Sequence, residues 1–345
     1  MGVVPHLKAP FKGESLQCPA CAAYVVYDAL AMRKPRLVSR SGRLRRFLSV
    51  QMEAFVNGYF RTPVWCTGAN LQRLVVCLYH RWLPRVNYRR ELSVLSDRGL
   101  VALDWLNEDR PGSQRRPWRP LLPAVAALGF PGLVVNRGGY GAMPLTGHRI
   151  TYTASVRDFA ELVSKVRKPY QLECLLAAGV SLGGLLLSLH LCQRGPHAQL
   201  DAALAVSPPF DLAVATRTLS NAWGFNRLLN ACITRGLVGR LRDSEEVVRV
   251  AKVIRADDVF RCWTLASFDP HSAAPAFGFQ SAQVFYENCS SKGWLCMVQR
   301  PLVFLGSAND SLNLERTLPE DEMLKSPWLA AVVTQGGGHL GFVDG

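Results

Sequence analysis

The stretch LAAGVSLGGLLLSL (176–189) places a serine, Ser181, between two glycines at two residues' distance on each side, Gly179 and Gly183. Two interpretations of this pattern are open. Small residues allow two elements to pack closely, and the serine is then a packing residue. Alternatively, the glycines allow a sharp turn that exposes Ser181 as a nucleophile. Features elsewhere in the chain distinguish between these two interpretations.

The residues on either side of Ser181 differ in their expected structure. The short apolar run at 174–180 predicts a buried strand, and 182–195 predicts a helix that ends at Gly195. G-x-S-x-G on a strand, turn and helix is typical of a nucleophile elbow. We expect a side chain at either glycine to clash in so tight a turn. The N–H of Leu182 is then directed at a developing oxyanion.

Strands and helices alternate around this stretch, which indicates βαβ units and a mostly parallel sheet. A helix is expected at 155–167, where Val156, Phe159, Leu162 and Val163 share a face. The expected strands are short apolar runs at 132–136, 174–180, 200–209, 301–307 and 327–335. The sequence therefore predicts an α/β fold in which Ser181 stands at the carboxyl end of a strand.

Two regions depart from this alternation. Residues 88–106 alternate apolar and polar side chains around Asp97–Gly99, which predicts a β-hairpin, followed by a loop at 107–120 and the end of a helix at 121–130. Residues 210–300 are rich in helical patterns with mixed charge. We interpret this segment as an inserted helical subdomain.

A serine needs a base and a group that orients the base, because its own hydroxyl is a weak nucleophile at neutral pH. Elbow folds supply these partners in the order serine, acid, histidine. Asp310 follows the strand expected at 301–307, and His339 follows the next expected strand behind three glycines. Both residues stand at carboxyl ends of strands, where α/β sheets build their sites. Ser181, Asp310 and His339 are therefore the candidate catalytic residues.

Composition limits the classes of function. The chain has 345 residues, 49% of them hydrophobic, and a formal net charge of +14. Seven basic residues and no acid occur in 33–46, but aromatic residues are not interleaved as in a single-strand-binding platform, so we do not expect nucleic acid as a partner. The ten cysteines are scattered, which argues against a disulfide framework. Cys18 and Cys21 form a CxxC with no second pair at zinc spacing, and we expect no metal.

The N-terminal residues 1–60 combine an apolar stretch at 18–32 with the basic run at 33–46. An apolar stretch followed by basic residues is typical of a cytoplasmic-side membrane anchor, but a span needs about 20 apolar residues. Three alternatives remain: a shortened span, an interfacial helix, and a partly buried lead-in to the domain. We expect a membrane-associated protein, with the endomembrane system as a plausible location.

Five segments together resemble one family, the membrane-bound branch of the α/β-hydrolase-domain proteins, which includes phospholipases, monoacylglycerol lipases and acetylesterases. The likeness extends from about Lys34 to Gly345. It implies an α/β-hydrolase domain at 61–345, a triad of Ser181, Asp310 and His339, an N-terminal single-pass anchor, and neither metal nor organic cofactor. The segments are TPVWCTGANLQ (62–72), GLVVNRGGYG (132–141), AAGVSLGGLLL (177–187), FGFQSAQVFYENCS (277–290) and GGGHLGFVDG (336–345).

The chain departs from the family pattern in three places. The family has a strand, a proline–glycine loop and most of a helix before the strand at 132–136, and too few residues separate Arg119 from Gly129 to hold all of it. That segment provides the second oxyanion donor. The helix that usually follows the histidine is missing, and the anchor is short. We therefore expect an α/β-hydrolase fold with a helical cap insert that lacks one central strand and the C-terminal helix.

The function expected from these residues is hydrolysis of a lipid ester through an acyl-enzyme on Ser181, at a membrane surface. The alternative is a catalytically impaired relative that binds a lipid or a protein partner, and the shortened oxyanion region favours it.

Overall fold

The computed structural model describes residues 32–63, 66, 68–79, 86–106, 114–116, 130–141, 143–146, 154–170, 172–220, 224–312 and 317–343. Several predicted features lie outside these residues. They are the apolar stretch at 18–32 except for Met32, the CxxC, the helix end predicted at 121–130 except for Phe130, and most of the loop predicted at 107–120.

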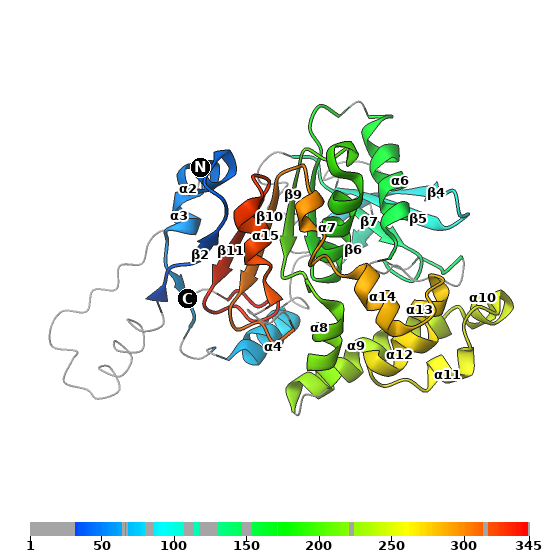
Figure 1. The fold of residues 1–345 in the computed structure, drawn as a ribbon. Helices are drawn as coiled ribbons and strands as arrows, with labels where there is room; N and C mark the ends of the chain where they lie inside the picture. The colour runs from blue at the N-terminus through cyan, green and yellow to red at the C-terminus, as the bar shows by residue number, and fades with distance from the viewer. Residues whose placement is uncertain are drawn as a thin grey trace.

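A parallel sheet forms the part of the molecule that holds Ser181 (Figure 1). Its strand order is β2-β11-β10-β9-β8, and only β2, at one edge, runs antiparallel to its neighbour. The strands are short and rich in alanine, valine and leucine, as expected for a sheet covered on both faces. Four of the strands confirm predicted ones, with bounds β8 (Leu176–Val180), β9 (Ala202–Val206), β10 (Leu302–Ser307) and β11 (Leu329–Thr334). The sequence analysis did not predict the edge strand β2 (Arg36–Val38).

A second sheet is antiparallel throughout, in the order β6-β4-β5-β7. The hairpin predicted at 88–106 is confirmed as β4 (Val86–Val94) and β5 (Leu100–Leu106). Arg98 adopts a φ of 63° in its turn, and the Asp97 carboxylate accepts a 2.8 Å hydrogen bond from Gly99 N–H. The other two strands are β6 (Gln114–Arg116) and β7 (Leu133–Arg137).

Strands β7 and β8 belong to different sheets, and we refer to this interruption as the division between β7 and β8. The sequence predicts β7 as part of the parallel sheet, but β7 pairs antiparallel with β5, and no described strand pairs with its other edge or with the outer edge of β8. Hydrophobic side chains at this division are accessible: Val135 is 37% exposed, Leu176 55% and Val180 39%. In a closed sheet such positions are usually covered.

One helix spans the division. Leu162 and Val166 of α6 (Val156–Arg167) pack with Val101 and Leu103 of the antiparallel sheet. Val163 of the same helix belongs to the core of the parallel sheet. The helical prediction at 155–167 is thus confirmed, and α6 holds the two sheets against a common layer.

Further helices cover the parallel sheet, and α7 follows Ser181 directly. Most residues of α7 are buried, because it packs between the sheet and the remaining helices. The other elements outside the insert are β1 (Met32–Arg33), α2 (Arg43–Gln51), α3 (Glu53–Val56), β3 (Phe60–Arg61), α4 (Ala69–Tyr79), α7 (Leu182–Arg194), α15 (Glu320–Lys325) and the 3₁₀ helix η3 (Gly195–His197). A second 3₁₀ helix, η4 (Leu295–Met297), lies at the end of the insert.

The segment between β9 and β10 is helical, as its sequence indicates. Its helices gather beneath the sheet in the view of Figure 1 and have their own core around Val238, Leu241, Val259 and Phe268. The helices are α8 (Leu212–Ser220), α9 (Phe225–Arg242), α10 (Glu245–Ala251), α11 (Ala256–Phe260), α12 (Leu265–His271), α13 (Ala273–Ala276) and α14 (Ala282–Cys289).

No helix in the described part of the chain combines the length and the apolar character needed to cross a membrane. The cysteines described as free thiols are Cys66, Cys174, Cys192, Cys232, Cys262, Cys289 and Cys296.

Candidate active site

Ser181 occupies the turn between β8 and α7, where the sequence predicts an elbow. Its φ is 51°, a left-handed conformation that is strained for a side chain other than glycine. The turn is fixed to the neighbouring strand β9, because Ser181 N–H donates a 2.8 Å hydrogen bond to the carbonyl of Val206. Leu182 is the first residue of α7, so its N–H is among the helix amides that have no acceptor within the helix.

The two glycines of the motif have different roles. A Cβ at Gly179 would lie 2.4 Å from the carbonyl oxygen of Gly183, so only glycine fits at position 179. At Gly183, in contrast, a Cβ would meet nothing within 4 Å. The expectation that a side chain would clash at either position is therefore wrong for Gly183, because its Cα–Cβ direction points away from the strand. Gly184 is a second position where the backbones of the strand and the helix lie close together, because a Cβ there would lie 3.1 Å from the carbonyl oxygen of Gly179.

The three candidate catalytic side chains meet at the carboxyl ends of the parallel strands. Ser181 Oγ lies 2.8 Å from Nε2 of His339, and Nδ1 of His339 lies 2.9 Å from Oδ2 of Asp310. Asp310 is 2% exposed and His339 6%. The other carboxylate oxygen, Oδ1, accepts a 2.8 Å hydrogen bond from Leu312 N–H. A proton on Nδ1 that is donated to Asp310 leaves Nε2 to accept from the serine hydroxyl.

The loop that carries His339 is held by residues that the sequence analysis did not single out. Asn309 Oδ1 accepts a 2.8 Å hydrogen bond from Gly338 N–H, and Ser307 Oγ lies 3.0 Å from Gly338 O. Gly338 has a φ of 54°, and a Cβ there would lie 2.6 Å from the carbonyl of Ala69 on α4. The signal that could have found Asn309 is its position directly before Asp310.

Arg73 of α4 is a second such residue. It is 5% exposed, and its Nη2 donates a 3.0 Å hydrogen bond to Ser311 Oγ, beside Asp310. Its Nε lies 3.4 Å from the carbonyl oxygen of His339. Ser311 in turn contacts Asn226 of α9 at 3.3 Å. Arg73 therefore joins the loops of the acid and the base from the side of α4.

Known proteins resemble the chain along nearly its whole length. Phospholipase ABHD3 of Bos taurus is 28% identical over 357 residues, which cover 96% of this chain and 85% of that protein. The putative esterase YheT of Escherichia coli (strain K12) is 24% identical, covering 81% of this chain and 85% of that protein. The chain has an α/β-hydrolase fold. It is related to phospholipase ABHD3, to esterases and to a monoacylglycerol lipase of Saccharomyces cerevisiae (strain ATCC 204508 / S288c) that is 24% identical over 62% of the chain.

No family model matches the chain. Among solved structures, the Pyrococcus furiosus esterase Pf2001 is 14% identical to this chain in sequence. The alignment covers 74% of this chain and 83% of the esterase, with a TM-score of 0.46.

A second buried histidine, His190, belongs to the core of the domain. His190 of α7 is 1% exposed, lies 2.9 Å from the carbonyl of Ala198 and packs edge-on against Phe159, so it is a core histidine. Burial lowers its pKa. Within the described ranges, no three His, Cys, Asp or Glu side chains are grouped as a metal site would require.

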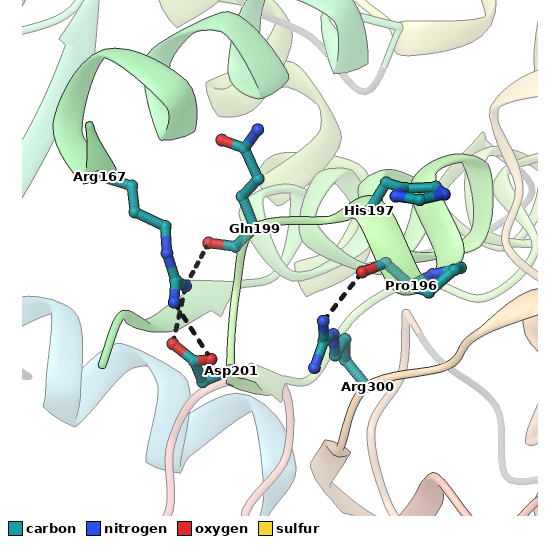
Figure 2. A pocket seen from close by; sticks show the side chains of 6 residues that line it. All are labelled: Arg167, Pro196, His197, Gln199, Asp201 and Arg300. Carbon is teal, nitrogen blue, oxygen red and sulfur yellow. Dashed lines mark hydrogen bonds and ion pairs between the residues drawn. The ribbon is translucent and has the colours of Figure 1, made fainter. Parts of the chain in front are cut away.

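A cavity of about 300 Å³ lies at the opposite ends of the strands from Ser181. Asp201 directly precedes β9 and Arg300 stands just before β10, so both mark amino ends of parallel strands (Figure 2). The charged groups are already paired: Arg167 binds Asp201 at 2.8 Å, and Arg300 donates to Pro196 O at 2.9 Å. Burial by itself would raise the pKa of Asp201, but the hydrogen bonds from Arg167 and from Leu175 N–H outweigh it, and the pKa is lowered.

Proposed function

We propose that this hydrolase cleaves the carboxylic ester bond of a lipid through an acyl-enzyme on Ser181. The observation that carries the proposal is the continuous chain of contacts from Ser181 Oγ to His339 at 2.8 Å and from His339 to Asp310 at 2.9 Å. Relatives described as phospholipases and as a monoacylglycerol lipase support a lipid ester as the substrate.

The reaction follows from the roles that the geometry allows. Ser181 Oγ attacks the ester carbonyl while its proton passes to Nε2 of His339, and Asp310 holds the imidazole in orientation. The tetrahedral intermediate collapses, and the alcohol leaves with the proton from Nε2. Water then attacks the acyl group, His339 takes its proton, and Ser181 recovers that proton as the fatty acid departs.

Stabilisation of the oxyanion is the step in which this hydrolase is expected to differ from its relatives. The N–H of Leu182 supplies one donor. The second donor of the family comes from the segment that the sequence analysis expects to be absent, and within the described residues no strand pairs with the outer edge of β8. Loss of one oxyanion donor typically lowers turnover by about 10²–10³. We therefore propose slow turnover rather than none.

A second candidate is a hydrolase-fold protein that binds a lipid or a partner without turnover. The observation that favours it is that, among the described strands, none pairs with the outer edge of β8, the strand directly before the nucleophile. The hydrogen-bonded triad favours the first candidate. A protein that only binds its ligand does not need these three side chains to stay within hydrogen-bonding distance of one another.

The experiment that separates the two candidates is labelling of the purified chain with a fluorophosphonate probe. Ser181→Ala is the matched variant, and circular dichroism establishes that both proteins are folded. Labelling that is lost in the variant supports an activated Ser181, and a panel of phospholipid and acylglycerol esters then identifies the substrate. A folded wild-type protein that takes no label overturns the hydrolase proposal in favour of the binding module.

A further inference from the structure

The outward side of α2 and α3 carries apolar side chains that the fold leaves accessible. The four residues Phe47, Val50, Met52 and Phe55 are 57%, 63%, 40% and 42% exposed, and we refer to them as the α2–α3 patch. The opposite side of the same helices is buried, with Leu48 and Val56 packed against Ala330 and Val332 of β11. The buried side of the two helices therefore fixes the patch to the domain, and its apolar side chains face outward.

Positive charge surrounds the patch. Arg43 and Arg46 are exposed and share one face of α2 with Phe47 and Val50, at helical spacings of three and four residues. Residues 33–46 contain seven basic residues and no acid, and Glu53 is the single acid in 47–60. Several of the seven bind within the fold: Arg36 pairs with Glu320, and Arg40 and Arg45 donate to the carbonyls of Lys325 and Ser39. The others give this side of the domain a positive field.

Phenylalanine and aliphatic side chains beside arginines on short helices are the composition of an interfacial membrane-binding surface. The apolar groups enter the boundary between headgroups and acyl chains, and the arginines bind lipid phosphates. We propose that the α2–α3 patch docks this protein on the surface of an anionic membrane. The proposal concerns a surface and does not depend on whether Ser181 is active.

The charge argues against other occupants. A second copy of the chain, placed patch to patch, would bring two clusters of arginine together, and like charges in contact are unfavourable. Nucleic acid would satisfy the arginines but would leave Val50 and Met52 in water. An anionic bilayer is complementary to both halves of the surface, because its phosphates lie directly beside its apolar layer.

The test is sedimentation of the purified full chain with vesicles of phosphatidylcholine alone and of phosphatidylcholine with 30% phosphatidylserine. We expect binding to the anionic vesicles only, at physiological salt. The variant Phe47→Ser/Val50→Ser/Phe55→Ser should lose at least about tenfold in affinity. Arg43→Gln/Arg46→Gln should lose about 25-fold, roughly fivefold for each charge.

A matched control replaces exposed apolar residues far from the patch, Leu228 in α9 and Val250 in α10, which are 61% and 74% exposed. Leu228→Ser/Val250→Ser should bind as the wild type does. The proposal is overturned if the wild type does not bind anionic vesicles, or if both patch variants bind like the control, which would assign the binding to another segment. Because all the replaced side chains are exposed, circular dichroism of each variant should match the wild type, and the charge variant tests the proposal even if the apolar variant is unstable.

Discussion

Ser181 Oγ lies 2.8 Å from Nε2 of His339, although 158 positions separate the two residues in the chain. The contact is possible because β8 and β11 end at the same edge of one parallel sheet. Ser181→Ala and His339→Ala should each reduce hydrolysis of a soluble p-nitrophenyl ester by about 10⁴–10⁶. The residues act as a unit, so the double variant should be no slower than either single variant. A much slower double variant would show that they act independently.

Gly179 and Gly183 should respond differently to the same substitution. Gly179→Ala places a Cβ 2.4 Å from the Gly183 carbonyl, which the turn can accommodate only by moving Ser181. We expect probe labelling to fall at least about 100-fold, because a displacement of about 1 Å has an effect of this size. Gly183→Ala has open space and lies in a helix, where alanine is favoured over glycine by about 1 kcal/mol. It should label normally and melt at the wild-type temperature or above.

Arg73 should affect catalysis without contacting the substrate. Arg73→Met removes the hydrogen bonds to Ser311 Oγ and to the carbonyl of His339, and the loops of the acid and the base lose their common support. We expect kcat to fall by about tenfold or more, with KM changed less than twofold. Arg73→Lys keeps the charge but not the forked geometry, so it should recover activity only in part. Equal loss of kcat and gain in KM in the methionine variant would indicate a role in binding instead.

The ion pair between Arg137 and Asp158 should stabilise the domain, because it joins the end of β7 to α6 and both side chains are buried. Asp158→Asn removes this carboxylate from the buried guanidinium of Arg137, which also pairs with Asp97 at 2.7 Å. We expect the free energy of unfolding to fall by roughly 3 kcal/mol in urea titrations. The matched control, Glu245→Gln, removes a solvent-exposed partner of Arg249 and should leave the free energy of unfolding unchanged. A similar effect of both variants would contradict the importance of burial.

Alkaline pH should destabilise the protein in part through Cys192. Burial raises the pKa of this thiol to about 12 from its ordinary value of 9.0. The unfolded chain therefore releases the proton near pH 9 while the folded chain keeps it, and the stability declines as pH rises from about 9 toward 12. Between pH 8 and pH 10.5, Cys192→Ala should lose about 2 kcal/mol less than the wild type in urea titrations. Tyr286, whose pKa burial also raises, acts in both proteins and cancels in the comparison. Identical pH slopes would show that Cys192 ionises normally.

The sequence by itself determined the local elements of this protein. The apolar run at 301–307 gives β10, whose Leu302 and Phe304 are buried in the core of the parallel sheet. The apolar run at 174–180 gives β8, but the prediction that this strand is buried is wrong at Leu176 and Val180, which are exposed. Glycine at position 179 could also be predicted, since no side chain fits the turn. The order of Ser181, Asp310 and His339 named the three residues that the fold then brings together.

Only the tertiary structure decided how these elements meet. The break between β7 and β8 depends on which strand edges pair, and a strand's own sequence does not specify its neighbour. Arg73 and Asn309 have unremarkable sequence contexts, and their positions beside His339 arise from contacts between distant parts of the chain. The freedom at Gly183 depends on the direction of a single Cα–Cβ bond in three dimensions. Local pattern follows from side-chain periodicity, whereas strand pairing and close approach follow from packing that only the folded chain provides.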